Sequence, residues 1–506
     1  MIKLPPSSLK KVSINFVFSG FTFFILSIVN LWNLGIIVQN FGFNTLGLLA
    51  LIRNISHFGL GSIFDLSTSE NTTFLVAKQL AGKSRELRFG RLSVLFIGNI
   101  IGAFVLGLIL FIFSEKYLPN IIASAETADL ANTIDFKILA FIIPFGVVSL
   151  FAEAIIKGFE KFSIIRILEI CGSLTFVGCT VFSILYDKPT SWLVTALLFI
   201  WFGRSICSLT IGCFIFFNQF SKFDFYPQTD DWIYSSKRVI AFYPGKLISA
   251  VQQQTIPLFL SFWFGLSAVG FYELATRIPK FFKSAFSFCI NVLTPYLVKK
   301  RELGESAKIG ELYQYGSIIL QIMLIPTIFI AIALTEPFSI IWIKDTDTDL
   351  YIWMSIAMMS LLVVPLLSYR QTFIVHSSSL LIFTSLFSLL RVIAIYTAAF
   401  LLSDWVDEKV IITIEVLAWL TIGSIEMSVI SKKLEFKGVD FRIYFKIFTI
   451  AFTICIFTFF FWDLTNNGYL AGLVSAILLI ASWRFLWLSI FPVSLRKNIT
   501  QYISSL

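Results

Sequence analysis

The sequence contains few charged residues and almost no histidine. Asp, Glu, Lys and Arg together make up 14% of its 506 residues, whereas a soluble domain carries roughly a quarter. Hydrophobic residues make up 57% of the chain, and its mean hydropathy is +0.86. The two histidines, His57 and His376, do not suffice for an imidazole-based metal site. This composition excludes an ordinary soluble protein and predicts a polytopic membrane protein.

Cysteine pairs and common catalytic motifs are also missing. The six cysteines lie in apolar runs without C-x-x-C spacing, which favours packing over disulfide or metal chemistry. No GxxxxGK[ST], GxSxG or HExxH sequence occurs, so no site of those types is expected. The longest predicted extracytoplasmic loop, about 115–133, is short for a membrane glycosyltransferase or polymerase. The sequence therefore predicts that the chain is not an enzyme and uses no cofactor.

Apolar runs and helix-breaking residues predict an all-α protein with about fourteen membrane helices. The predicted ranges are 14–37, 43–80, 88–114, 133–159, 163–186, 190–218, 236–264, 268–298, 309–343, 348–376, 379–402, 411–432, 443–462 and 468–492. Basic residues cluster in every second loop, as at 78–91 and 432–446, and the other loops are acidic. By the positive-inside rule, both termini are expected to face the cytoplasm.

Two similar stretches indicate how the helices are organised. The sequence "GKSREL" (82–87) follows the second predicted helix, and "KKREL" (299–303) follows the eighth. We expect two six-helix lobes related by a parallel pseudo-two-fold axis around a central cavity, as in transporters with parallel repeats. The predicted domains are an N-terminal lobe (1–218), a polar cytoplasmic linker (219–235), a C-terminal lobe (236–434), and two further helices with a tail (435–506).

Nine basic residues fall inside predicted helices, where each costs roughly 2.5–3.5 kcal/mol at the bilayer centre. They are Arg53, Arg204, Lys246, Arg277, Lys280, Lys283, Arg370, Arg391 and Arg484. Arg370 and Arg484 lie near helix ends, from which long side chains reach the interface. Arg204 and Arg391 are expected to pair with acids on neighbouring helices, for which the candidates are Glu153, Glu415 and Glu426.

The eighth predicted helix carries the densest set of these cations. In "FYELATRIPKFFKSAF" (271–286), Arg277, Lys280 and Lys283 fall within about 120° of the helix circumference. Glu273 lies in the same arc and cannot neutralise all three. We therefore expect this stripe to line a wet cavity that holds an anionic ligand. Pro279 lies among the cations and is expected to kink the helix.

The second predicted helix holds Arg53, Asp65 and Glu70, and would span roughly 55 Å if it were straight. It must bend or project from the bilayer, and Gly59 and Gly61 mark the expected bend. Arg53 is predicted either to line the cavity or to pair with an acid elsewhere. In the seventh predicted helix, Lys246 precedes the polar run Gln252–Gln254, which is too polar for lipid and is expected to line the same cavity.

Three stretches resemble the polysaccharide flippase (Wzx-type O-antigen exporter) family of the multidrug/oligosaccharidyl-lipid/polysaccharide exporter superfamily. They are "FDLSTSENTTFLVAKQLAGKSRE" (64–86), "VGFYELATRIPKFFKSAFSFCINVLTPYLVKKRELGE" (269–305) and "FSIIWI" (338–343). The first is similar to the end of the family's second helix, and the second to its eighth-helix pattern Y-A-x-R-[IL] followed by P-x-L. The chain departs from the family where Ser84-Arg85 replaces Gly-Asp, and where Glu70 replaces an apolar residue or Thr.

The resemblance implies a V-shaped cavity that opens alternately to each side of the bacterial inner membrane. The implied substrate is an undecaprenyl-pyrophosphate-linked oligosaccharide, such as an O-antigen or capsule repeat unit. Arg53 and Arg277 would carry the pyrophosphate, with Lys280 and Lys283 as extensions. Lys246, predicted above to line the cavity, is a further candidate substrate-binding residue. The last two helices would form a groove for the lipid tail. Implied partners are membrane lipids, a polysaccharide polymerase and chain-length machinery, and no nucleic acid is expected.

Two other functions remain open from the sequence. Asp65, Glu70 and Glu153 are candidate sites for proton or sodium coupling, and such coupling also occurs in cation-coupled multidrug exporters of the same superfamily. Those exporters carry mostly cationic drugs and need acidic cavities, so the cationic stripe at Arg277 argues against this function. A lipid-binding scaffold without transport is a third interpretation, and the polar inner helices argue against it.

Overall fold

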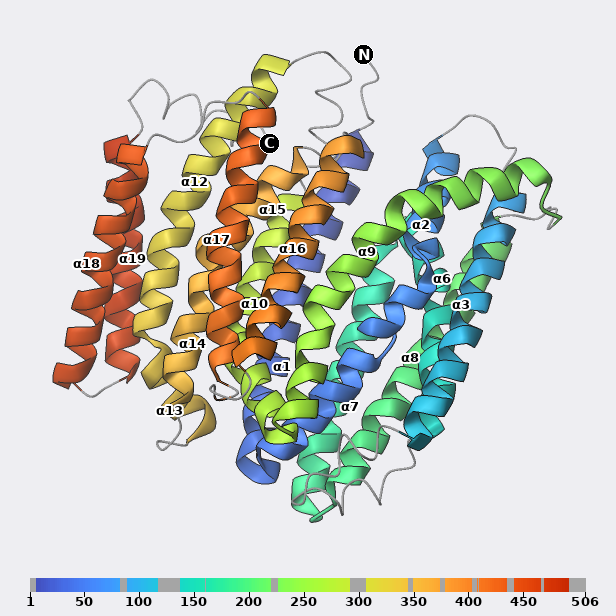
Figure 1. The fold of residues 1–506 in the computed structure, drawn as a ribbon, viewed down its shortest axis with the longest axis horizontal. Coiled ribbons are helices and arrows are strands. Elements are labelled where there is room, and N and C mark those ends of the chain that lie inside the picture. The colour runs from blue at the N-terminus through green and yellow to red at the C-terminus, as the bar shows by residue number, and fades with distance from the viewer. Residues whose placement is uncertain are drawn as a thin grey trace. The chain divides into compact units, whose positions relative to one another are not determined.

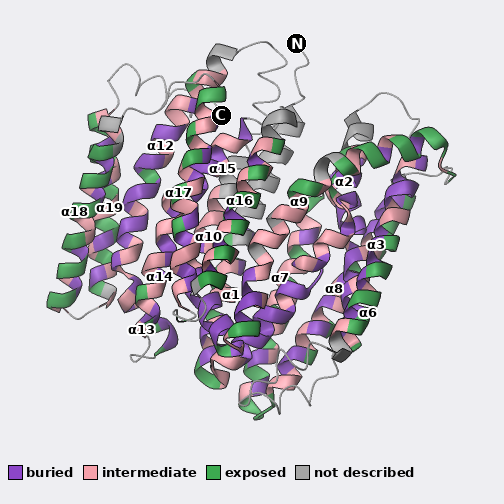
Figure 2. Cartoon of the chain, viewed as in Figure 1, coloured by how far each residue is buried: buried purple, intermediate pink, exposed green. Residues whose placement is uncertain are grey.

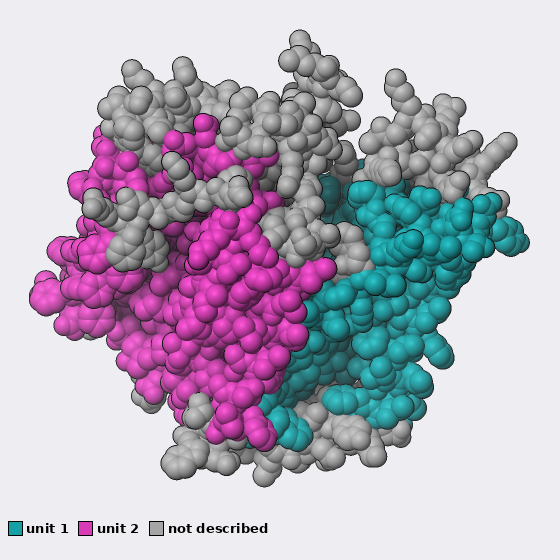
Figure 3. Space-filling view, turned by 45° about the horizontal axis from the view of Figure 1, so that its top comes forward, with its two compact units in different colours: residues 1–273 teal, residues 274–506 magenta. Residues whose placement is uncertain are grey.

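Every regular element of the described chain is helical, which confirms the predicted all-α fold (Figure 1). The computed structural model describes residues 6–81, 89–116, 137–159, 161–219, 226–291, 306–344, 349–373, 378–402, 407, 409–434, 441–465 and 468–490. Contacts within the chain define two compact units, residues 1–273 (unit 1) and 274–506 (unit 2), which Figure 3 colours separately. The domain boundaries expected from the sequence stay a prediction, although α9 already begins at Thr229, inside the expected linker.

Unit 1 contains the elements up to the first two turns of α10. They are α1 (Pro6–Ile55), η1 (Leu60–Asp65), α2 (Thr68–Ala81), α3 (Phe89–Lys116), α6 (Lys137–Gly158), α7 (Phe162–Leu185), α8 (Thr190–Gln219), α9 (Thr229–Trp263) and α10 (Leu266–Asn291). Helix α6 lies at the centre of this unit, because it packs against α2, α3, α7 and α8. The short helix η1 contacts α3, α6 and α9.

Two interruptions shape the first hundred residues. Gly42 has φ 78° and ψ 175°, a non-helical conformation that glycine adopts more easily than other residues. It separates the first two predicted helices, which are continuous in α1. The second helix is interrupted again between Ile55 and Thr68, where η1 lies. Gly59 and Gly61 are in this interruption, as predicted. A Cβ at Gly59 would lie only 2.1 Å from the Asn54 carbonyl oxygen, so this turn requires glycine.

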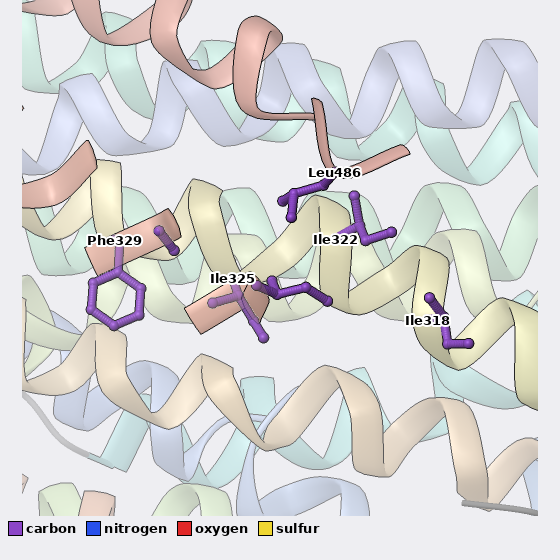
Figure 4. Close-up of a cluster of buried hydrophobic side chains, with 7 residues drawn as sticks. Ile318, Ile322, Ile325, Phe329 and Leu486 are labelled. Atoms are coloured by element: carbon purple, nitrogen blue, oxygen red, sulfur yellow. The ribbon is translucent and has the colours of Figure 1, made fainter. Parts of the chain in front are cut away.

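Unit 2 contains the rest of α10 and all later elements. They are α12 (Ser306–Ala333), α13 (Thr335–Ile343), α14 (Leu350–Met359), η2 (Ser360–Leu362), α15 (Val364–Thr372), α16 (Ser378–Leu402), α17 (Val410–Lys433), α18 (Phe441–Thr465) and α19 (Gly468–Ile490). Helix α12 packs against both α18 and α19. Their shared core includes Ile318, Ile322, Ile325, Phe329 and Leu486 (Figure 4).

Eleven helical segments of the described chain are long and apolar enough to cross a membrane. Helices α9 and α10 are not among them, since they carry the polar and charged residues that the sequence analysis singled out. Large apolar side chains are exposed on several helices, such as Phe104 on α3 and Phe460 on α18, each more than 65% exposed. Figure 2 shows exposed residues along both of these helices. Such faces suit lipid and not water. The chain is therefore a multi-pass membrane protein.

Candidate functional site

The break in the second predicted helix ends in a buried carboxylate. Asp65 is the last residue of η1, and its side chain is fully buried. Its Oδ1 accepts hydrogen bonds from the Thr68 hydroxyl at 2.6 Å and from Asn99 Nδ2 at 2.8 Å. Its Oδ2 accepts one from the Ser69 hydroxyl at 2.6 Å. These donors from α2 and α3 satisfy the hydrogen-bonding capacity of the buried carboxylate.

Lys246 on α9 forms an ion pair with Asp65. Its Nζ lies 2.8 Å from Asp65 Oδ2 and 3.0 Å from Glu70 Oε1. The Lys246 side chain is 18% exposed, whereas Glu70 is more than half exposed. The structure thus brings together one candidate substrate-binding residue, Lys246, and two candidate coupling residues, Asp65 and Glu70. Sequence reasoning had given them separate roles.

Arg53 forms an ion pair with Glu273, which is the pairing alternative left open by the sequence. Glu273 lies on the first part of α10 and its side chain is 1% exposed, while Arg53 at the end of α1 is about one-third exposed. The Arg53 side chain therefore remains partly accessible. The role of Arg53 toward a substrate stays a prediction.

The three cations of α10 are half-buried, and each of them has interaction partners within the protein. Lys283 Nζ lies 5.3 Å from the centre of the Trp419 ring on α17, and Glu415, Arg391 and Lys280 are within electrostatic range. On the same helix, Ile278, Phe282 and Phe286 pack against a buried cluster formed by Leu324, Ile328, Met358 and Leu361. Helix α10 therefore has an apolar packed side in addition to its cationic stripe.

Glu153, the third candidate coupling residue, belongs to an ion-pair network in unit 1. Glu153 Oε1 on α6 lies 3.0 Å from Arg204 Nη2 on α8, and Arg204 also approaches Glu169 on α7 at 3.5 Å. Lys157 contacts the second oxygen of Glu153 at 3.8 Å. The Arg204 guanidinium also lies 4.6 Å from the centre of the Phe58 ring. The expectation that Arg204 pairs with one of Glu153, Glu415 and Glu426 is confirmed, with Glu153 as the partner.

Arg391, expected to pair with one of the same three acids, pairs with Glu426 in unit 2. Both side chains are at most 2% exposed, and Gln371 Nε2 donates a further hydrogen bond to Glu426 at 2.8 Å. Arg391 also donates to the Ser388 hydroxyl and stacks 4.3 Å from the Trp419 ring centre. Arg370, expected to reach the interface, instead donates hydrogen bonds to the Met427 carbonyl and the Ser431 hydroxyl.

An apolar cavity of about 380 Å³ lies between α18 and the segment from α12 to α14. Ile332, Ile352, Cys455 and Phe459 are among its lining residues. Its polar groups are few, and the hydroxyls of Thr335 and Ser355 bond to each other at 2.6 Å. A cavity with these walls suits a hydrocarbon chain.

Sequence reasoning missed the residues that complete these clusters. Asn99 is a single amide inside an apolar run, Gln371 follows Arg370 in the polar stretch SYRQT, and Trp419 is one of many aromatic residues in the membrane helices. An amide inside a membrane helix is a usable signal, because an unpaired amide in hydrocarbon is costly. No comparable signal marks Trp419.

Comparisons with solved structures identify proteins whose fold is similar to that of this chain. No protein-family model and no curated protein sequence matches the chain. A structure of the lipid II flippase MurJ in an inward closed conformation is similar, with a TM-score of 0.72 and 15% identity, covering 93% of this chain and 97% of that one. An inward-facing multidrug resistance MATE family transporter of the MOP superfamily gives a TM-score of 0.60 with 14% identity, covering 82% of this chain and 99% of that one. The Vibrio cholerae MATE transporter VcmN in its bent form gives 0.53 with 15% identity, covering 85% and 98% respectively. The chain therefore has the fold of MurJ and the MATE transporters.

Proposed function

We propose that this protein is a flippase for undecaprenyl-pyrophosphate-linked oligosaccharides, such as O-antigen or capsule repeat units, in a bacterial inner membrane. Translocation would occur by alternating access. The observation that carries the proposal is the cationic stripe of α10, where Arg277, Lys280 and Lys283 lie half-buried within one hydrophobic helix. The fold, shared with a lipid II flippase, supports a lipid-linked substrate.

The chemistry of the substrate fits the charges of these residues. A pyrophosphate accepts bidentate hydrogen bonds from guanidinium groups, which stay charged when they are partly desolvated. Arg53 and Arg277 are the proposed guanidinium contacts, and Lys246, Lys280 and Lys283 would add point charges. Because each of these cations already interacts within the protein, the substrate must replace some of those partners when it binds.

The membrane potential can drive the proposed export. Moving one negative charge outward across a membrane that is negative inside gains about 2.3 kcal/mol per 100 mV. The polyprenyl tail would remain in the hydrocarbon, and the cavity beside Cys455 and Phe459 is a candidate site for part of it. We further propose that Asp65, Glu70 and Glu153 take part in ion coupling.

Flipping of a labelled polyprenyl-pyrophosphate sugar in proteoliposomes tests the proposal, with and without a membrane potential. Arg277→Glu should abolish flipping at an unchanged protein level, because it turns a phosphate contact into a repulsive charge. Lys237→Glu is the matched control, since it makes the same charge change at an exposed position on α9. Normal flipping by Arg277→Glu would contradict the role of the stripe.

The alternative is a cation-coupled multidrug exporter, which the MATE structures favour. Such a transporter needs acids that are available to cationic drugs. In unit 1, however, the buried acids Asp65 and Glu153 each have a basic partner, Lys246 and Arg204. A drug-resistance screen on cells expressing the protein separates the two functions, because only the exporter would raise resistance to cationic drugs.

A further inference from the structure

The ammonium group of Lys246 occupies the position that a free cation would take between two carboxylates. It contacts Asp65 Oδ2 at 2.8 Å and Glu70 Oε1 at 3.0 Å, with Glu70 Oε2 at 3.2 Å. These three residues come from α9, η1 and α2 of the same unit. Among the described residues, Lys246 is the cation in contact with Asp65.

The surroundings of Asp65 have more oxygen acceptors than the protein satisfies. Asn99 is fully buried and donates from Nδ2 to both Asp65 Oδ1 and the Val147 carbonyl. Its Oδ1 has no hydrogen-bond partner within the described chain. This unpaired oxygen belongs to the same amide group whose Nδ2 binds the Asp65 carboxylate. Buried acceptors of this kind normally have a donor or a bound ion.

We infer that Asp65 and Glu70 form a sodium site whose resident cation is the side chain of Lys246, with the Asn99 amide holding Asp65 in place. Carboxylate and amide oxygens are the ligands that hard cations prefer. A lysine ammonium carries the same single charge as a sodium ion, and its stem holds it at the site at a high effective concentration. Free sodium is excluded as long as Lys246 is in place.

This assignment has a consequence for coupling, which rests on the proposed function. An anionic headgroup that draws Lys246 away from Asp65 leaves a buried carboxylate without its cation. The return of Lys246 then favours release of the headgroup. At Asp65 and Glu70, Lys246 thus takes the place of the coupling ion and links the two events without a sodium gradient. The membrane potential acting on the substrate remains as the driving force.

Sodium binding to the full-length protein in detergent tests the site without any flipping assay. Two quantities are measured at pH 8. The first is the thermal stability in NaCl and in choline chloride of equal ionic strength, and the second is the binding of ²²Na⁺. Wild type should show no sodium-dependent stabilisation. Lys246→Met removes the ammonium while it keeps a long apolar stem, and should gain saturable sodium binding at least tenfold tighter than that of wild type.

Two further variants make the result specific. Asp65→Asn in the Lys246→Met background should abolish the gained binding, because it removes the central carboxylate. Lys237→Met should behave like wild type, since Lys237 is exposed on the same helix. If Lys246→Met is folded only in NaCl, the site is also supported.

Three outcomes would overturn the inference. The first is sodium binding by wild type that Asp65→Asn removes. The second is a Lys246→Met protein whose thermal stability is the same in NaCl and in choline chloride, or which binds no ²²Na⁺, while the double variant Lys246→Met/Asp65→Asn is stably folded. The third is a Lys246→Met protein stabilised by lower pH and not by sodium, since its carboxylate would then take a proton. None of these outcomes depends on the identity of the substrate.

Discussion

Gly47 on α1 and Gly270 on α10 lie where the two helix backbones are in direct contact. A Cβ on Gly47 would lie 1.9 Å from the Leu266 carbonyl oxygen, and a Cβ on Gly270 would lie 2.1 Å from the Phe43 carbonyl oxygen. The Arg53–Glu273 ion pair lies within two helical turns of these glycines, Arg53 after Gly47 on α1 and Glu273 after Gly270 on α10. The glycines thus hold the two helices close enough for this pair to form.

Replacing either glycine by alanine should therefore destabilise the protein. In a helix, Gly→Ala ordinarily stabilises by about 0.5–1 kcal/mol, but at Gly47 or Gly270 the new methyl group must push two backbones apart. Overpacking of this kind costs about 1–3 kcal/mol. We expect Gly47→Ala and Gly270→Ala to lower the midpoint of thermal unfolding in detergent.

Gly178 provides the matched control for these two substitutions. It lies in α7, and a Cβ added there would have no other atom within 4 Å, so Gly178→Ala should leave the unfolding midpoint unchanged or raise it slightly. Equal effects of Gly47→Ala and Gly178→Ala would show that the α1–α10 contact is not tight.

The buried Arg391–Glu426 pair should show strong coupling between its two members. Removing one partner of a buried ion pair leaves an uncompensated charge and costs about 3–5 kcal/mol. Arg391→Met leaves Glu426 with a neutral donor, the Gln371 amide, in place of a counter-charge, and Glu426→Gln leaves the guanidinium without its carboxylate. The double variant Arg391→Met/Glu426→Gln removes both charges and should recover most of the loss. A double-mutant cycle on unfolding measures this coupling, and additive losses would count against it.

Hydropathy and the cost of buried charge predicted much of this architecture. The interruption at Gly59 follows from the length of the second helix, which exceeds the membrane thickness. That Arg204 and Arg391 pair with acids follows because isolated charges are costly in a bilayer, although the sequence left Glu153, Glu415 and Glu426 open as the partners. Each of these predictions used only the local sequence and the general free-energy cost of placing a charge or an overlong helix in a membrane.

The choice of partners across long sequence separations could not be predicted in the same way. Lys246 and Asp65 are 181 residues apart, and Arg53 and Glu273 are 220 apart. Periodicity places each side chain on a helix face but does not show which two faces meet. The contact of α9 with η1 decides the first pair, and the glycine crossing of α1 and α10 accompanies the second. For this reason Lys246 and Asp65 received separate roles from the sequence.

Two cations contact the same carboxylate of Glu153, and they should differ in energy. Arg204 is 15% exposed and lies 3.0 Å away, whereas Lys157 is 41% exposed and lies 3.8 Å away. Water screens the Lys157 pair, which should contribute less than about 1 kcal/mol. Arg204→Met should therefore cost several times more unfolding free energy than Lys157→Met. Equal losses in chemical denaturation would mean that Glu153 is better hydrated than its burial indicates.

Cys455 offers a direct test of the apolar cavity, because it is one of the lining residues. A variant in which Cys455 is the single cysteine, with the other five replaced by alanine, can be labelled with a thiol-reactive dye in detergent. A polyprenyl phosphate should slow the labelling in a saturable way, since its hydrocarbon chain would cover the thiol. A short-chain isoprenyl phosphate should have a smaller effect. A single-cysteine variant that keeps Cys213, which is exposed on α8, should label at the same rate with and without the lipid. Equal slowing at both positions would indicate general coating by lipid and would remove the cavity as a tail-binding site.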